Sequence, residues 1–312
     1  MARYENILGL IGNTPMVNIS QLSPNPNVRI YAKLEGQNPG GSSKDRIALK
    51  MVELAEEAGT LKLGATIIEP SSGNTGIGLA LVARMRGYRL RVVMPDNVSI
   101  ERRQLLEIFG AEIISSPGSE GSNGAIRLAE KLAAENPELQ MLFQYGNPAN
   151  PLAHYEGTGP EIWRDCPELD VFVAGLGTSG TLMGAGRYLK EQNPDIQVVA
   201  VEPPAGELVQ GLRSLDDGFI PPIFDPDLLD RRFIVRPLES IEWLRRLLND
   251  CGVFAGISSG ASIAGAVKIA EAMDSGTIVT VLPDGGWKYL SSGAWTDALE
   301  VVEERATRIN FW

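Results

Sequence analysis

A lysine in a turn rich in glycine and serine is the first residue here that could do covalent chemistry. Lys44 lies near the end of Asn38–Arg46, which reads NPGGSSKDR, and opens a helical pattern. The first turn of a helix carries partial positive charge and disfavours an ammonium group. A solvated lysine at a loop–helix junction is the ordinary explanation. The alternative is an amine held as an imine to an aldehyde cofactor, without that charge.

Three other turns are rich in glycine and small polar residues. They are SSGNTG at 71–76, GLGTSGT at 175–181 and AGISSG at 255–260. The turn at 175–181 suits a phosphate, because Gly177 and Gly180 let the backbone approach an anion and a predicted helix follows. The turn at 71–76 brings hydroxyls, an amide and backbone N–H groups together, which suits a carboxylate.

Two of these turns also match motifs of other enzyme classes. Gly175, Gly177 and Gly180 form G-x-G-x-x-G, and Glu202 ends the next predicted strand, so a nicotinamide-dependent dehydrogenase stays open. The GISSG segment matches the nucleophile elbow of hydrolases, G-x-S-x-G. That class needs a histidine after the serine. The sole histidine, His154, precedes it, so we interpret this match as a coincidence.

The overall composition is that of a globular protein acting on small molecules. The 312 residues are 44% hydrophobic and 21% charged, with a net charge of -11, and this acidic balance argues against a nucleic-acid partner. Cys166 and Cys251 do not lie in a metal-ligand spacing. No apolar run reaches the roughly 18 residues of a membrane span, and the N-terminus lacks a signal-peptide pattern. We expect no metal, no membrane attachment and a cytoplasmic location.

Strand and helix patterns alternate through almost the whole chain, with an irregular segment at 203–238. This alternation indicates parallel sheets flanked by helices. We predict an α/β fold with two doubly wound sheets, helices on both faces, and a division near residues 146–150. Ligands of such sheets bind at the carboxyl ends of the strands, where all four turns lie. The predicted strands are 28–34, 65–69, 89–94, 111–115, 141–145, 171–174, 197–201 and 277–282; the predicted helices are 44–59, 77–87, 100–110, 124–135, 182–192, 241–249, 258–273 and 295–306.

One arginine in the irregular segment is a candidate anion ligand. Arg213 stands in GLRSLDDGFIPP, and the planar fork of its guanidinium suits a phosphate or a carboxylate. The alternative is a surface arginine paired with Asp216 or Asp217.

In order and spacing, the four turns together resemble the pyridoxal-phosphate β-family of fold type II. The resemblance covers nearly the whole chain and includes IGNTP at 11–15, MPDN at 94–97, ERRQLLEIFGAEI at 101–113 and QYGNPANPLAHYEGTGPEIW at 144–163. It is greatest to cysteine synthases of the B type. Arg213 and the WKYLSSGAW segment look most like the members that use O-phosphoserine.

The resemblance implies a role for each motif. Lys44 would hold pyridoxal 5′-phosphate as an imine and shuttle protons. Asn74 would contact the ring hydroxyl of this cofactor, and Ser258 its pyridine nitrogen. Arg213 would bind the leaving phosphate of O-phosphoserine, although O-acetylserine enzymes of this type can also carry an arginine here. The cofactor phosphate would be held by Gly177, Thr178, Ser179, Gly180 and Thr181, and the substrate α-carboxylate by Ser71, Ser72, Thr75 and Gln144.

The implied reaction is a β-replacement that makes L-cysteine from O-phosphoserine or O-acetylserine through an aminoacrylate. The sulfur would come from sulfide or from the thiocarboxylate of a small carrier protein. The resemblance also implies a homodimer, with the active site in the crevice between two domains. The smaller, mobile domain would be 41–148, and the larger, cofactor-anchoring domain 1–40 with 149–312. A tail at about 305–312 would fold over the mouth of the crevice.

Other functions stay open at this point. Cystathionine β-synthase and serine or threonine dehydratase share the enzyme class; the first usually carries haem or regulatory segments that we do not expect here. A dehydrogenase would leave Lys44 without a role. A non-catalytic protein of the same fold would be expected to lose Lys44 or the turn at 71–76, and both are present.

Overall fold

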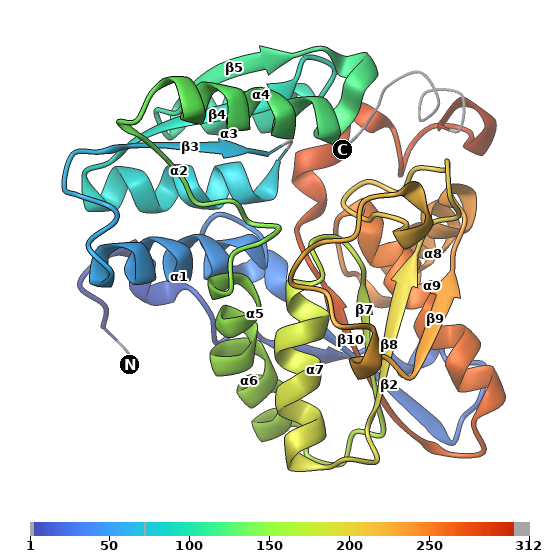
Figure 1. The fold of residues 1–312 in the computed structure, drawn as a ribbon. Helices are drawn as coiled ribbons and strands as arrows, with labels where there is room; N and C mark the ends of the chain where they lie inside the picture. The colour runs from blue at the N-terminus through green and yellow to red at the C-terminus, as the bar shows by residue number, and fades with distance from the viewer. Residues whose placement is uncertain (1–2, 72, 303–312) are drawn as a thin grey trace.

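Two sheets covered by helices make up the protein. The computed structural model describes residues 3–71 and 73–302. In these residues the larger sheet has six strands, in the order β1-β2-β10-β7-β8-β9, and the smaller has four, in the order β5-β4-β3-β6. Figure 1 shows the smaller sheet with its helices above the larger one. The predicted α/β class with two doubly wound sheets is confirmed.

The larger sheet combines strands from both ends of the chain. Its neighbours pair in parallel except β1 and β2, which are antiparallel. Helices α6 (Gly159–Asp165) and α7 (Gly180–Gln192) pack on one face, and α8 (Pro237–Cys251) and α9 (Ile257–Ala272) on the other (Figure 1). The strands are β1 (Met16–Asn18), β2 (Val28–Leu34), β7 (Val171–Gly175), β8 (Gln197–Glu202), β9 (Arg231–Ile234) and β10 (Gly276–Leu282).

The smaller sheet is parallel, and its central strands are largely buried on both faces. Ile67 packs with the helices of one face and Ile68 with α4 on the other, which is why these strands read as continuous apolar runs. Its strands are β3 (Thr66–Pro70), β4 (Arg89–Pro95), β5 (Glu112–Ser116) and β6 (Leu139–Met141); its helices are α1 (Lys44–Glu57), α2 (Asn74–Arg86) and α3 (Ile100–Ile108) on one face and α4 (Gly121–Glu135) on the other.

Helix α2 begins at Asn74, three residues before its predicted start. The hydroxyl of Ser71 accepts hydrogen bonds from the N–H groups of Gly73 at 3.3 Å and Gly76 at 3.0 Å. The first N–H groups of a helix have no partner within it and need such acceptors. The turn therefore places Asn74 and Thr75 on the first turn of a helix, where their side chains are held by the fold.

The predicted strand at 141–145 is wrong beyond Met141. There β6 ends, and Phe143 takes a left-handed backbone conformation with φ of 57°. The buried carboxylate of Glu69 accepts the N–H of Phe143 at 2.8 Å and that of Gln144 at 2.9 Å. These N–H groups bond to a side chain instead of a neighbouring strand, and burial raises the pKa of Glu69 to about 7.

The last predicted helix, at 295–306, is wrong in its first turn. Residues 293–297 form a turn and a bend, and the chain is helical at 299–302, where the described residues end. The guanidinium of Arg245 donates to the carbonyl of Ala294 at 2.7 Å and to that of Asp297 at 2.6 Å. These carbonyls are thus engaged by a side chain of α8.

Strand β1 and two later regions are elements that the sequence pattern did not indicate. Strand β9 lies within the irregular segment, at the edge of the larger sheet. Residues 149–165 form α5 (Ala149–Ala153), a π-helical turn (His154–Thr158) and α6. Among the helices of the described part, none combines the length and apolar character needed to span a bilayer.

Candidate active site

Loops at the carboxyl ends of strands from both sheets meet at one cavity. A second, adjoining cavity is lined by Lys44 and the turn at 175–181. Together they bring into one place every candidate site residue that the structure describes, whereas Ser72 and the tail at 305–312 lie outside the described residues. The first cavity is lined by Lys44, Ser71, Asn74, Thr75, Gln144, Gly177, Thr178, Arg213 and Ser258, with Gly73, Arg102, Ser122, Tyr145, Gly211, Leu212, Pro283 and Tyr289, which the sequence did not single out.

Lys44 is the first residue of α1, as its position in the sequence predicted. Its Nζ lies 3.3 Å from the hydroxyl of Ser43. Burial lowers the pKa of Lys44 below its ordinary 10.5, while Asp284 and Glu35 act in the opposite direction. A lowered pKa makes the neutral, nucleophilic form of the amine more available.

The residues 177–181, here called the phosphate cup, leave no space for a side chain at two positions. A Cβ on Gly177 would lie 2.8 Å from the carbonyl oxygen of Gly211, and one on Gly180 only 1.8 Å from Oδ1 of Asn150. The cup leads directly into α7, which begins at Gly180. The free N–H groups at a helix N-terminus bind anions. Backbone N–H groups that no side chain covers, followed by the start of a helix, can therefore bind a phosphate group.

The sole histidine contacts this phosphate cup. The Nδ1 atom of His154 lies 2.8 Å from Oγ1 of Thr158, and its Nε2 lies 3.2 Å from Oγ1 of Thr181. Burial and the charge of Lys44 lower the pKa of His154 to about 3, so the imidazole is neutral. Sequence spacing gave no sign of this contact between His154 and the hydroxyl of Thr181.

The candidate ligands for an amino-acid carboxylate are linked to one another. The hydroxyl of Thr75 donates to Oε1 of Gln144 at 2.6 Å, and Nε2 of Gln144 donates to the carbonyl of Pro70 at 3.2 Å. Because β3, α2 and the segment after β6 are connected in this way, the side chains of Thr75 and Gln144 are held together in the lining of the cavity.

Arg213 lines the same cavity and is 6% exposed. Its guanidinium carbon lies 5.4 Å from the ring centre of Tyr145 and 4.6 Å from that of Phe219. Two aromatic rings therefore orient the guanidinium. The alternative of a surface arginine is wrong, because this side chain is buried.

The carboxamide of Asn74 is held by two side chains that the sequence did not single out. Its Nδ2 donates to Oδ2 of Asp284 at 2.7 Å, and its Oδ1 accepts from Nζ of Lys288 at 2.7 Å. Asp284 closely follows β10. The same rule that located the four turns, the carboxyl ends of parallel strands, could have found it.

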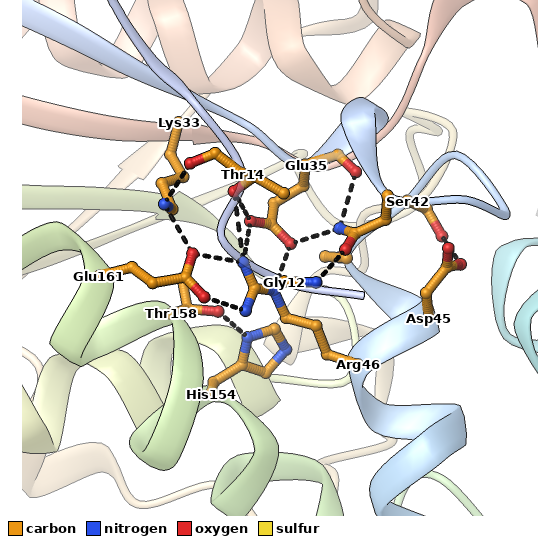
Figure 2. A network of polar contacts seen from close by, with 12 residues as sticks. Gly12, Thr14, Lys33, Glu35, Ser42, Asp45, Arg46, His154, Thr158 and Glu161 are labelled. Carbon is orange, nitrogen blue, oxygen red and sulfur yellow. Dashed lines mark hydrogen bonds and ion pairs between the residues drawn. The ribbon is translucent and has the colours of Figure 1, made fainter. Parts of the chain in front are cut away.

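A buried ionic cluster fixes the helix that carries Lys44. Figure 2 shows Arg46 between two carboxylates: its Nε and Nη2 lie 2.7 and 2.8 Å from Glu35, and its Nη1 and Nη2 both lie 2.7 Å from Glu161. Lys33 lies 2.7 Å from Glu161 and supplies a second positive charge. The cluster joins α1 to the end of β2 and to α6. Glu161 lies 115 residues from Arg46 in the sequence, so spacing gave no sign of the cluster.

The acidic residue that a dinucleotide site would need is engaged elsewhere. Glu202 is fully buried, its Oε2 accepts the N–H of Leu215 at 2.8 Å, and its Oε1 lies 3.0 Å from Arg232. It does not line either cavity, so the dehydrogenase alternative loses its ribose ligand. In residues 3–71 and 73–302, no group of three or more histidine, cysteine or acidic side chains is placed to hold a metal ion.

The chain belongs to the pyridoxal-phosphate dependent enzyme family, whose model matches residues 7–284. Among curated proteins, it is 44% identical over 298 residues to a cysteine synthase of Staphylococcus aureus, covering 92% of this chain and 96% of that protein. It is 40% identical over 294 residues to cysteine synthase B of Pseudomonas aeruginosa, covering 94% of this chain and 98% of that protein.

Solved structures agree with this assignment. The fold is similar to that of an O-ureido-L-serine synthase, with a TM-score of 0.90, 40% identity and coverage of 95% of this chain and 97% of the other. It is also similar to a cysteine synthase of Entamoeba histolytica, with a TM-score of 0.89, 35% identity and coverage of 98% and 96%. The predicted family, fold type and cofactor are confirmed.

Proposed function

We propose that this protein is a cysteine synthase, which replaces the β-substituent of an activated L-serine by sulfur. The observation that carries the proposal is one site that holds a partly buried amine, Lys44, beside the phosphate cup and beside Ser71, Thr75 and Gln144, whose polar groups can bind a carboxylate. These are the groups that an aldehyde phosphate cofactor and an amino acid require together. The similarity to curated cysteine synthases over nearly their full length supports it.

The residues present fit pyridoxal 5′-phosphate. When bound, the cofactor supplies an electron sink for the bonds at Cα of an amino acid. The phosphate cup, residues 177–181, would hold its phosphate, and Asn74 would donate to its ring hydroxyl. Ser258, at the start of α9, would face the pyridine nitrogen. A neutral serine at that position would leave the pyridine nitrogen without a charged partner, which would suit loss of a β-substituent.

Lys44 would move the protons of the reaction. Its amine would hold the aldehyde group of the cofactor and would be freed when an amino acid binds. It then takes the proton from Cα as a general base and returns one after sulfur has added to Cβ. The lowered pKa of Lys44 favours the neutral form that this step needs.

The α-carboxylate of the substrate would be bound by Ser71, Thr75 and Gln144, with Ser72 as a fourth ligand by resemblance. We further propose that residues 41–148 move as a unit and close these ligands over the substrate. Closure would exclude water, which would otherwise divert the reaction to pyruvate. Formation of pyruvate instead of cysteine would favour the dehydratase alternative.

The first experiment tests the cofactor linkage at Lys44. Purified protein is expected to be yellow, with an absorbance that borohydride bleaches, and Lys44→Ala should lose this absorbance. Lys50→Ala is the matched control, because Lys50 lies on the same helix and pairs with Glu156 at the surface. Colourless, cofactor-free protein that still makes cysteine would refute the proposal.

O-phosphoserine is the activated serine that we propose. The support is the buried guanidinium of Arg213, which two aromatic rings orient in the cavity. An arginine–phosphate contact contributes about 1.5–3 kcal/mol, or roughly 10- to 150-fold. Arg213→Ala should therefore lower kcat/KM for O-phosphoserine by that factor and change the value for O-acetylserine much less. Equal losses for the two substrates would exclude this role.

The proposal extends to partners. The sulfur would come from sulfide or from a carrier-protein thiocarboxylate, and the protein would act as a homodimer. Cysteine formation with each donor, and the mass of the protein in solution, test these points.

A further inference from the structure

Lys288 is a charged side chain that the proposed reaction does not use, and it is fully buried. It lies in the 3-10 segment Gly286–Ser292, after β10. Burial lowers its pKa to about 8, while Asp284 and Asp45 act in the opposite direction. A buried ammonium is costly unless its hydrogen bonds are satisfied. Its Nζ donates to Oδ1 of Asn74 at 2.7 Å and to the carbonyl of Gly41 at 3.1 Å.

The contacts on the other side of Asn74 make the arrangement directional. Asp284 Oδ2 accepts from Nδ2 of Asn74 at 2.7 Å and also from the hydroxyl of Tyr289. The amide oxygen therefore faces a cation and the amide nitrogen an anion. A flipped amide would place NH₂ against the ammonium and oxygen against the carboxylate, so both contacts would become repulsive.

The contacts with Lys288 and Asp284 determine which hydrogen-bonding group of Asn74 faces the cavity. A carboxamide NH₂ group has two hydrogens, and one of them is given to Asp284. The second can go to an acceptor in the cavity that Asn74 lines. Without the cation on its oxygen, the amide could turn and offer an acceptor in place of this donor.

We propose that Lys288 is a positioning residue, which holds Asn74 so that its N–H points at the ring hydroxyl of the cofactor. The carbonyl of Gly41 fixes the ammonium, and the ammonium fixes the amide. This inference rests on the proposed function, because it assumes that Asn74 contacts the cofactor ring.

The first test compares Lys288→Met with Lys268→Met. Lys268 lies on α9 and pairs with Glu239 at 2.8 Å, away from both cavities. The apoprotein is titrated with pyridoxal 5′-phosphate, and the loaded protein is scanned for the ratio of its absorbance bands, which reports ionisation of the ring hydroxyl. Lys288→Met should weaken cofactor binding about tenfold and shift the band ratio. Lys268→Met should change neither.

A double-mutant cycle then separates positioning from a merely structural role. If Lys288 acts through Asn74, the double variant Asn74→Ala/Lys288→Met should match Asn74→Ala within about twofold in cofactor affinity and share its band ratio. If the loss of cofactor affinity in the double variant equals the product of the losses in the two single variants, the inference is wrong. A Lys288→Met protein that has a lowered melting temperature but unchanged affinity and band ratio would also overturn it.

The outcomes also separate this inference from the proposed function. If Asn74→Ala leaves the affinity and the band ratio unchanged, the role of Asn74 is wrong, and the inference fails with it. If Asn74→Ala changes them and Lys288→Met does not, only the inference fails. Should Lys288→Met not fold, Lys288→Gln keeps a polar side chain there but removes the charge that distinguishes the amide oxygen of Asn74 from its nitrogen. It should shift the band ratio in the direction of Asn74→Ala, and an unchanged ratio would overturn the inference.

Discussion

Burial of the Lys44 amine determines the pH at which the protein can capture its cofactor. Only a neutral amine attacks an aldehyde, and the pKa of Lys44 is lowered from 10.5, against the opposing effect of Asp284. We expect the rate of pyridoxal 5′-phosphate capture by the apoprotein to rise with pH and to level off with a midpoint below 10.5. Stopped-flow absorbance measures this rate.

Asp284→Asn provides the control for this pH profile. The carboxylate of Asp284 stabilises the ammonium form of Lys44, so its removal should move the midpoint to still lower pH. A midpoint at or above 10.5 in the unaltered protein would contradict the effect of burial.

At the scale of single residues, short motifs located turns whose described residues line the two cavities. Lys44, Asn74 and the phosphate cup each lie in a turn whose glycines and hydroxyls can be read directly. Lys288 and Arg102 were missed, because a lysine or arginine in a polar segment looks the same whether it is solvated or buried. Their burial depends on chain segments that are distant in sequence.

At the scale of elements, the ionic cluster of Arg46 links α1 to the end of β2 and to α6. Removing one partner of a buried ion pair leaves an uncompensated charge and costs about 3–5 kcal/mol. Arg46→Met should lower the free energy of unfolding by this amount, because Glu35 and Glu161 would lose their shared partner. Urea unfolding of both proteins at pH 7 measures the difference.

Arg86 supplies the matched control for this substitution. It lies at the end of α2 and pairs at the surface with Glu53 at 3.4 Å and Glu56 at 3.5 Å. Exposed pairs contribute about 0–1 kcal/mol, so Arg86→Met should have a small effect. Equal effects of the two substitutions would contradict the role of the buried cluster.

The same cluster should make stability depend on pH. Contacts with Arg46 outweigh the effect of burial and lower the pKa of Glu35 from 4.5 to about 2. A carboxyl whose pKa is lowered in the folded state stabilises the fold above its unfolded pKa, and this contribution is lost as the pH falls through the folded pKa. Glu35→Gln should therefore be less stable than the unaltered protein at pH 7, by about 3 kcal/mol.

The difference between these two proteins should shrink as the pH is lowered from 4.5 towards 2. Urea unfolding over this range measures it. A difference that is independent of pH would show that Glu35 acts through packing and not through its charge.

Across the whole molecule, the start of α3 links to the segment after β10. The carboxylate of Glu101 accepts from the N–H of Ser291 at 2.7 Å and from its hydroxyl at 2.8 Å, and the hydroxyl of Ser99 donates to the carbonyl of Lys288 at 3.2 Å. These contacts join the smaller sheet's helices to the segment that carries Lys288. They would stabilise a closed arrangement of the two proposed domains.

Glu101→Ala should loosen this link. The loss of two solvent-exposed hydrogen bonds, about 0.5–1.5 kcal/mol each, should raise KM for the activated serine roughly 5- to 150-fold and change kcat less. Steady-state kinetics measures both. Glu107→Ala, an exposed residue on the same helix, should change neither constant. A loss confined to kcat would contradict a role in closure.

The sequence by itself determined the class of fold and the turns that carry the chemistry. Both are local properties. Apolar runs typical of strands alternate with segments of helical periodicity, and glycines mark where the backbone can approach an anion. Tertiary structure decided the rest, because it depends on distant partners. Glu69 ends β6 early, Arg46 ties α1 to the larger sheet, and Lys288 clamps Asn74 from a segment more than two hundred residues away. A buried charge finds its partner through the fold and not through sequence spacing.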